Sequence, residues 1–239
     1  MSSQHHNALT VRLNENPLRR ALIGHEFFQS VKNAPVTLEQ VAVFIGQWWH
    51  PLHYFPTFLA RAVAALPDIS SKSAIARILN QETGEGRTQR AHEVVYVDSM
   101  KRVGFTAAQA SEAAPFTETV ALLEGYERAS NARYSALGFI FATEVADLAM
   151  VSGIGTAVER ATGASDIEWV NIHVAQEPDH VEEADHAMLP SFSAGEEASI
   201  IEYAEQMWSL WIAFFDRLQR ELFRAPHVIS QRGLVAHGA

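Results

Sequence analysis

Residues 44–66, FIGQWWHPLHYFPTFLARAVAAL, indicate the fold class of this chain most clearly. Apolar side chains recur every three or four residues along the stretch, which places them on one face of an α-helix. Pro51 and Pro56 lie inside this pattern. Each proline removes one backbone hydrogen bond and crowds the preceding turn, so we expect the helix to bend there. The preceding segment Thr37–Gln40, TLEQ, matches a capping box and predicts where the helix begins.

The same helical period extends from residue 16 to residue 224, and alternating strand patterns are absent from the sequence. We find no internal repeat, low-complexity block or linker. Residues 1–239 are therefore expected to form a single all-α domain of about seven helices, with an ordered core from about residue 16 to residue 224. The other predicted segments are Pro17 through Lys32, Ser70 to Arg102 interrupted at Gly84 and Gly86, a turn at Thr106–Ala110, Phe116 to Ala129, Tyr134 to Ala161 closed by Gly163, a helix capped by Ser165 or Asp166 and running through His186, and Ala194 to Arg224.

Composition restricts the chemistry that the protein can perform. The 239 residues carry a formal net charge of −10 and include no cysteine. Disulfides, thiolate metal sites and cysteine nucleophiles are thereby excluded, so a metal ion would have to be bound by nitrogen and oxygen. The negative charge and the lack of basic runs argue against nucleic acid and favour a small-molecule partner. Neither a membrane span nor a secretion signal is apparent, which predicts a cytoplasmic protein.

The most informative stretch for function is residues 169–186, WVNIHVAQEPDHVEEADH. His173, Glu177 and His180 are spaced i, i+4, i+7, and on a helix they fall within about 60° of one another. Two imidazoles and a carboxylate on one face are ligands that iron, manganese or zinc accepts. The alternative interpretation of the same triplet is a solvated polar face.

Two features of this stretch complicate the pattern. Pro178 interrupts the backbone hydrogen bonds beside Glu177, at a cost of roughly 3 kcal/mol in a helix interior, which predicts a local departure from regular helix. A second polar stripe lies about 120° round the helix, and we expect it to be solvated or to support the ligands from outside. It consists of Asp179, Glu183 and His186.

A second candidate segment is NQETGEGRTQRAHE, residues 80–93. Glu82 and His92 lie ten residues apart and would be about 80° out of register on an ideal helix. The glycines within the segment supply a plausible distortion. On a regular helix Glu85 would be the better partner of His92, so Glu85 is an alternative ligand, and an exposed charged helix is the simpler alternative.

A third candidate segment is FIFATEVADLAM, residues 139–150, in which Glu144 and Asp147 interrupt an otherwise apolar run. Charged side chains are rarely buried unless they are paired or bind a metal ion. Glu144 is the more central of the two, although an ion pair with an arginine would also explain it. The three segments together supply three carboxylates and three histidines, which is the inventory of a carboxylate-bridged di-iron site.

With these motifs the sequence resembles the heme-oxygenase-like di-iron oxidases, a family of seven-helix bundles. That pattern is a glutamate and a histidine about ten apart, a glutamate some fifty residues later, and then a histidine, a carboxylate and a histidine at i, i+4, i+7. The resemblance covers residues 80–186 in motif and favours Glu82 over Glu85. The metal ligands that it implies are Glu82, His92, Glu144, His173, Glu177 and His180.

Two positions depart from the usual family pattern. Glu177 stands where many relatives carry aspartate, and Pro56 stands where some carry a further carboxylate, about 26 residues before Glu82. The resemblance therefore implies the version of the site with six ligands. It also implies two Fe(II) ions and dioxygen as co-substrate, oxidation of a small amine or amino acid, and in some cases an external electron donor. Assembly as a homodimer is a further expectation.

Aromatic residues at helical spacing are candidates for the walls of a substrate pocket, although such residues more often belong to an ordinary core. The competing hypotheses for the whole protein are a metal-independent enzyme of the same fold, of the thiaminase or quinone-cofactor-synthesis kind, a ferritin-like di-iron protein, and a non-enzymatic helical scaffold. The thiaminase kind relies on a cysteine that this chain lacks. The candidate pocket residues are Trp48, Trp49, Phe55, Phe139 and Phe141.

Overall fold

The structure is a computed structural model that describes residues 8–224; the remaining ends of the predicted 1–239 domain lie outside the described residues. Every regular element between residues 8 and 224 is a helix, which confirms the all-α prediction. The elements are α1 (Ala8–Asn14), α2 (Pro17–Ile23), α3 (Glu26–Asn33), α4 (Leu38–Ala65), α5 (Ile69–Glu82), the 3-10 turn η1 (Thr88–Arg90), α6 (His92–Arg102), α7 (Ala107–Ser111), α8 (Thr117–Ala129), α9 (Arg133–Thr162), α10 (Glu168–Ala187), α11 (Ala194–Gln219) and a terminal π-helical turn, η2 (Arg220–Arg224).

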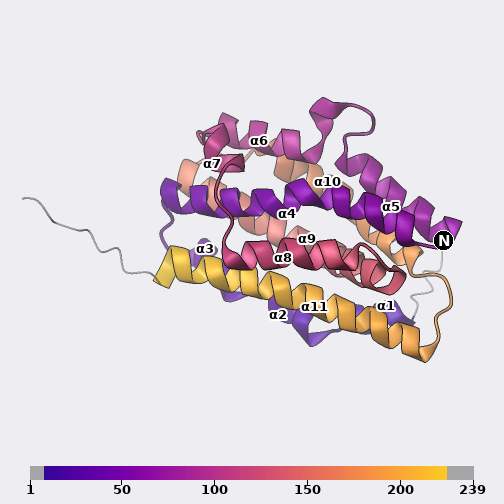
Figure 1. Cartoon of the computed structure of the whole chain (residues 1–239). Coiled ribbons are helices and arrows are strands. Elements are labelled where there is room, and N and C mark those ends of the chain that lie inside the picture. The colour runs from indigo at the N-terminus through magenta and orange to yellow at the C-terminus, as the bar shows by residue number, and fades with distance from the viewer. Residues whose placement is uncertain (1–7, 225–239) are drawn as a thin grey trace, which may run out of the picture.

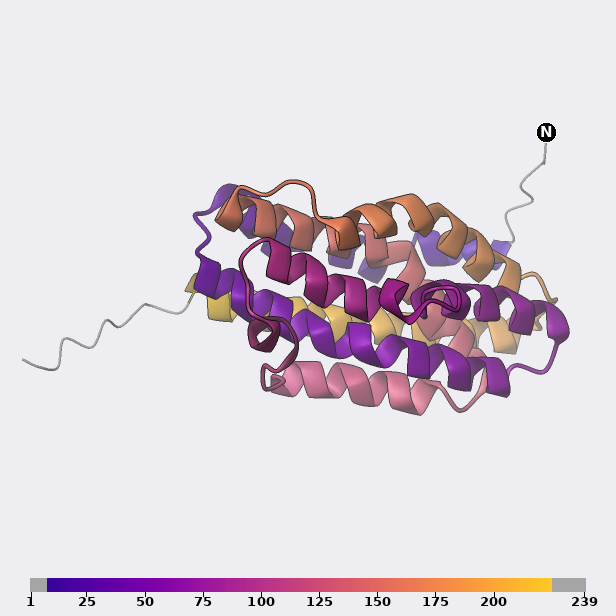
Figure 2. The same cartoon turned by 90° about the horizontal axis from the view of Figure 1, so that it is seen from above.

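The long helices run roughly along one common axis and form a single bundle (Figure 1). α9 lies at its centre, in contact with α4, α10 and α11. Seen from above, α5, α6 and α10 lie together on one face of the bundle (Figure 2). α9 is long and apolar enough to cross a membrane by length and composition, but 78% of its apolar window is buried, as expected for a central core helix. The candidate ligands therefore lie on helices that pack directly against one another.

The helices are more numerous than the seven predicted. The expected helix from Pro17 through Lys32 is divided into α2 and α3, the expected segment from Ser70 to Arg102 is divided into α5 and α6, and the short helix α1 precedes them all. The predicted helix from Pro17 through Lys32 ends at Ile23, and His25 then caps α3 by accepting a hydrogen bond from the backbone N–H of Phe27. α1 lies before the expected start of the core at residue 16. Its side chains Leu9 and Leu13 are fully buried, so the core begins earlier than predicted.

Helix boundaries elsewhere follow the predicted signals with one exception. Thr37 and Gln40 form the expected capping box at the start of α4, which continues as a helix through Pro51 and Pro56. Gly163 ends α9 in the left-handed conformation, with φ 79°, as its position predicted. The prediction that Ser165 or Asp166 caps α10 is wrong, since the N-cap is Ile167, and Ser99 of α6 instead accepts a hydrogen bond from the backbone N–H of Trp169 in the first turn.

Candidate metal centre

Glu82 and His92 come together because α5 does not continue into α6. α5 ends at Glu82 and α6 begins at His92, while Gly84 (φ 83°) and Glu85 (φ 53°) turn the connecting loop. A Cβ atom on Gly84 would lie 2.4 Å from the carbonyl oxygen of Arg87, so only glycine fits that position. The loop replaces the helix on which the two side chains would have been about 80° apart. As a result His92 Nδ1 lies 2.9 Å from Glu82 Oε2.

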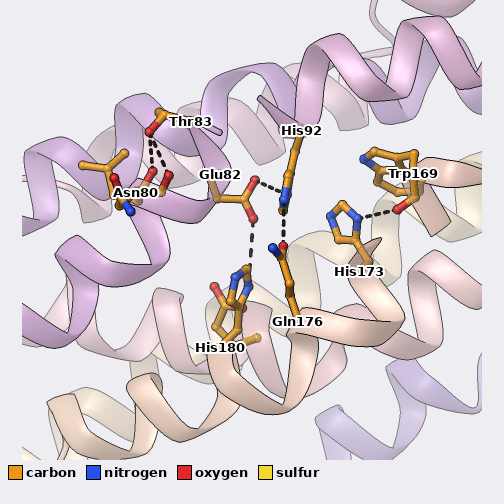
Figure 3. A network of polar contacts seen from close by, with 10 residues as sticks. Asn80, Glu82, Thr83, His92, Trp169, His173, Gln176 and His180 are labelled. Atoms are coloured by element: carbon orange, nitrogen blue, oxygen red, sulfur yellow. Dashed lines mark hydrogen bonds and ion pairs between the residues drawn. The ribbon is translucent and has the colours of Figure 1, made fainter. Parts of the chain in front are cut away.

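The six predicted ligands lie in two adjoining groups of three. In each group one nitrogen or oxygen atom from every residue lies within 4.8 Å of the others. The groups adjoin at His180, whose Nδ1 is 3.3 Å from Glu144 Oε2. The same nitrogen is 3.9 Å from Glu82 Oε1 (Figure 3). All six side chains are buried. We call Glu82, His92 and His173 the first group, and Glu144, Glu177 and His180 the second group.

Two histidines of the first group are held by a hydrogen bond on one ring nitrogen. His173 Nδ1 lies 2.9 Å from the carbonyl oxygen of Trp169, and His92 Nε2 lies 3.0 Å from the side-chain oxygen of Gln176 (Figure 3). Because a carbonyl oxygen only accepts, each of these nitrogens carries the hydrogen. In the neutral ring the opposite nitrogen then carries the lone pair, which is how proteins orient a metal-binding histidine.

Several atoms of the second group are buried without any hydrogen-bond partner in the described part of the chain. They are Glu144 Oε1, both carboxylate oxygens of Glu177, and His180 Nε2. A buried polar atom without a partner costs about 1–3 kcal/mol, and a charged one costs more. A divalent cation would satisfy all of them, and every one is a nitrogen or oxygen donor that iron accepts. The donor set therefore fits a metal ion.

The pKa values of the candidate ligands differ between the two groups. Burial alone raises the pKa of Glu82, but the adjacent His92 outweighs it and brings this pKa to about 2. Burial lowers the pKa of His173 to about 4, helped by repulsion from His92. Burial also opposes a proton on His180, but Glu144 outweighs it and raises that pKa to about 9. In the first group Glu82 and His173 have thus lost their protons at neutral pH, while the neighbouring Glu82 raises the pKa of His92 against the effect of burial. In the second group His180 is protonated.

Asp147 is an additional carboxylate beside the second group. It lies almost one turn after Glu144 on α9, close enough to Glu144 and Glu177 for their charges to repel. Burial and the repulsion between these carboxylates raise the pKa of both Asp147 and Glu177. Such a pair shares protons near neutral pH. The sequence pattern singled out Asp147 as an interruption of an apolar run but not as a neighbour of Glu177.

A small cavity of about 40 Å³ lies against both groups and is lined by Glu82, Glu144, His173 and His180. Its volume suits a few water-sized molecules and is far too small for an aromatic amino acid. Much of the remaining wall is aromatic. Those aromatic residues are Trp48, Phe55, Tyr126, Trp169 and Trp211.

Of the five predicted pocket residues, the structure brings Trp48 and Phe55 to this cavity but not the other three. Trp49 is turned about 100° from Trp48 around α4 and stacks on His53 instead. Phe139 packs against Phe58 and Tyr126 in the core. Phe141 is fully buried. These three are core or helix-packing residues, because side chains at adjacent helical positions face different neighbours.

The alternative ligands considered in the sequence lie outside both groups. Glu85 is close to Arg87, at 3.3 Å, in the exposed loop. Of the second polar stripe on α10, Glu183 is buried and paired with Arg77 at 2.6 Å, while Asp179 and His186 are exposed. α10 continues as a helix on both sides of Pro178, where the sequence predicted a local departure from regular helix.

Trp169 and Gln176, which orient the two histidines, were not found from the sequence. Both lie on α10, four residues before and three residues after His173. That spacing places them on the same helix face and is the signal that could have found them.

A family profile described as "Iron-containing redox enzyme" matches residues 42–212, well over half of the chain. The chain therefore belongs to this family of iron-containing redox enzymes. Both groups of candidate ligands lie within the matched residues. No curated protein sequence matches the chain.

Solved structures with the same fold share little sequence with this chain. A CADD-like protein from Nostoc punctiforme superposes with a TM-score of 0.77 at 14% identity, covering 90% of this chain and 96% of that one. A domain with a heme oxygenase-like fold from Shewanella denitrificans gives 0.70 at 14% identity, covering 89% and 91%. A TenA homologue from Pseudomonas syringae gives 0.69 at 15% identity, covering 92% and 96%. At these identities the likeness establishes the heme-oxygenase-like fold alone.

Proposed function

We propose that this iron-containing redox enzyme is a non-heme di-iron oxygenase or oxidase, with one iron ion bound by each group of three residues. The observation that carries the proposal is the pair of adjoining buried groups, whose ligand atoms lie within 4.8 Å of one another in each group. The unpartnered buried atoms of the second group support it, because a cation is the simplest partner that all of them share.

Within this proposal the protein positions the reactants and excludes water. Bound Fe(II) would supply the capacity to reduce dioxygen and so to oxidise a nitrogen or carbon position of the substrate. Trp169 and Gln176 fix the rings of His173 and His92. The aromatic wall of the small cavity keeps bulk water away from the centre. Its volume suits dioxygen better than an organic substrate.

We further propose that the substrate is a small amine or amino acid, that the enzyme works in the cytoplasm, and that electrons beyond those of the centre come from an external donor. In length and general character the chain resembles the nitrile-forming enzyme AetD, which acts on a brominated tryptophan. Conversion of a tryptophan to a nitrile is therefore one outcome to be tested.

A metal-independent enzyme of the same fold is the second candidate, since solved TenA homologues share the architecture. The chain contains no cysteine, so it lacks the thiol nucleophile of the thiaminase kind. In addition, a metal-independent site would leave the carboxylate of Glu177 buried without a cation. These observations favour the di-iron enzyme.

Anaerobic titration of the metal-free protein with ferrous iron tests the proposal. We expect two irons per chain in the wild type and one in Glu144→Gln, because the substitution removes a ligand of the second group only. Glu182→Gln, an exposed position on α10, is the matched control. The loaded protein is then mixed rapidly with dioxygen, with and without a panel of amino acids, and we expect a transient visible absorption whose decay a substrate accelerates. Uptake of less than one iron by the wild type would contradict the assignment.

A further inference from the structure

A second and larger hollow lies against the second group of ligands. It has a volume of about 510 Å³, and Glu144 and Glu177 line it together with residues of α2, α9 and α10. Its remaining walls are mostly apolar, and they include Ile23, Leu148 and Val181. Unlike the small cavity, this hollow is large enough for an amino acid with an apolar side chain.

Arg19 of α2 lines this hollow, and its charge is not paired with a carboxylate of the described residues. Its guanidinium is half-buried, and within residues 8–224 no carboxylate oxygen lies within 4.0 Å of it. Nε and Nη2 donate to the carbonyl oxygen of Val145, at 3.1 and 2.9 Å, and Nη1 donates to that of Asn14, at 3.2 Å. A guanidinium carries five N–H groups, so one N–H on each terminal nitrogen is left for a ligand.

The location of Arg19 ties it to the candidate centre. The carbonyl group that it contacts belongs to Val145, the residue directly after Glu144. Burial without a carboxylate lowers the pKa of Arg19, which reflects the cost of holding this charge away from water. A bound carboxylate would remove that cost, and the planar fork of arginine binds carboxylates through paired hydrogen bonds.

We propose that the hollow between α2, α9 and α10 binds an amino acid with an apolar side chain, whose carboxylate is held by Arg19. This inference rests on the proposed function, because it places the substrate beside the second group of ligands. The apolar side chain of the ligand packs against Ile23, Leu148 and Val181. The substrate class is thereby narrowed from amines in general to compounds that carry a carboxylate.

A purely structural role for Arg19 is the competing explanation, since its hydrogen bonds join α2 to α9 through Val145. A structural residue would affect folding but would not discriminate between ligands with and without a carboxylate. The test therefore compares matched ligands as well as matched variants.

Binding is measured calorimetrically under anaerobic conditions, on the protein loaded with ferrous iron and on the metal-free protein. The probes are L-leucine, L-phenylalanine and L-tryptophan, each paired with the amine that lacks its carboxylate. The variants are Arg19→Gln and Arg19→Lys, with Arg20→Gln, an exposed neighbour on α2, as control. Thermal unfolding of each variant checks that it is folded.

We expect at least one amino acid to bind the wild type and the Arg20→Gln control at least ten-fold more tightly than its amine. Arg19→Gln should weaken amino-acid binding about 10- to 100-fold and leave amine binding unchanged, and Arg19→Lys should restore part of the preference. If no amino acid of the panel binds, or if Arg19→Gln keeps the full preference, the inference is overturned.

The two proposals fail in different ways. If Arg19→Gln takes up as much iron as the wild type but loses the preference for ligands with a carboxylate, both the di-iron function and the role of Arg19 are supported. If the wild type takes up no iron but the metal-free protein still prefers ligands with a carboxylate, and this preference is lost in Arg19→Gln, the di-iron function is contradicted and the role of Arg19 is not.

Discussion

Iron binding should release protons, and the two groups of ligands should release different numbers. In the second group, the Glu177–Asp147 pair holds at least one proton at neutral pH and His180, with a pKa of about 9, holds another. A metal ion binds the deprotonated forms, so this group should release about two protons. In the first group Glu82 and His173 have already lost theirs.

The sign of the pH dependence follows from these proton numbers. Raising the pH removes protons that compete with the metal ion, so iron affinity should rise with pH. The rise is about ten-fold per pH unit for each proton released, hence on the order of 100-fold per unit for the second group. It should become less steep as the pH passes the value of about 9 at which His180 loses its proton. In the first group His92, whose pKa is raised above its usual value, is the main source of protons.

Anaerobic calorimetric titration with ferrous iron at about pH 7, in buffers of different ionisation enthalpy, counts the protons released per iron. Glu177→Gln should bind one iron and release less than one proton, because only the first group remains. Glu183→Gln is the matched control, since this buried carboxylate lies on the same helix but is paired with Arg77. Equal proton release by wild type and Glu177→Gln, or none in the wild type, would refute the reasoning.

Three further predictions concern stability and the support of the ligands. Gly84→Ala should lower the melting temperature by about 3–10 °C and weaken iron binding by displacing His92, because the added Cβ would lie 2.4 Å from backbone. Gly86→Ala is the control, since Gly86 also has a positive φ, 79°, but has open space around it. It should lower the melting temperature less and leave iron uptake unchanged. Gln176→Leu removes the hydrogen bond to His92 and should weaken iron binding about 10- to 100-fold in an anaerobic titration; unchanged affinity would show that this contact does not support the ligand. Glu177→Gln should raise the melting temperature of the metal-free protein by a few degrees, since it removes the repulsion between Glu177 and the carboxylates of Asp147 and Glu144, and a lowered value would contradict that account.

The sequence by itself determined the helical class and most helix boundaries, and together with the family resemblance it predicted six candidate ligands. Periodicity sufficed for His173, Glu177 and His180, because their spacing on one helix fixes a common face whatever the rest of the chain does. Local signals also sufficed for the capping box at Thr37 and the left-handed end of α9 at Gly163, since both depend on neighbouring residues alone.

Only the tertiary structure decided how the ligands divide and what surrounds them. Helical geometry separated Glu82 from His92, and the loop containing Gly84 reunites them through backbone conformations that spacing alone does not specify. The environment of Arg19 depends on where α2 packs against α9, a contact between residues more than a hundred positions apart. Periodicity fixes which face of a helix a residue occupies, but the neighbour that this face meets is set by the packing of the whole bundle.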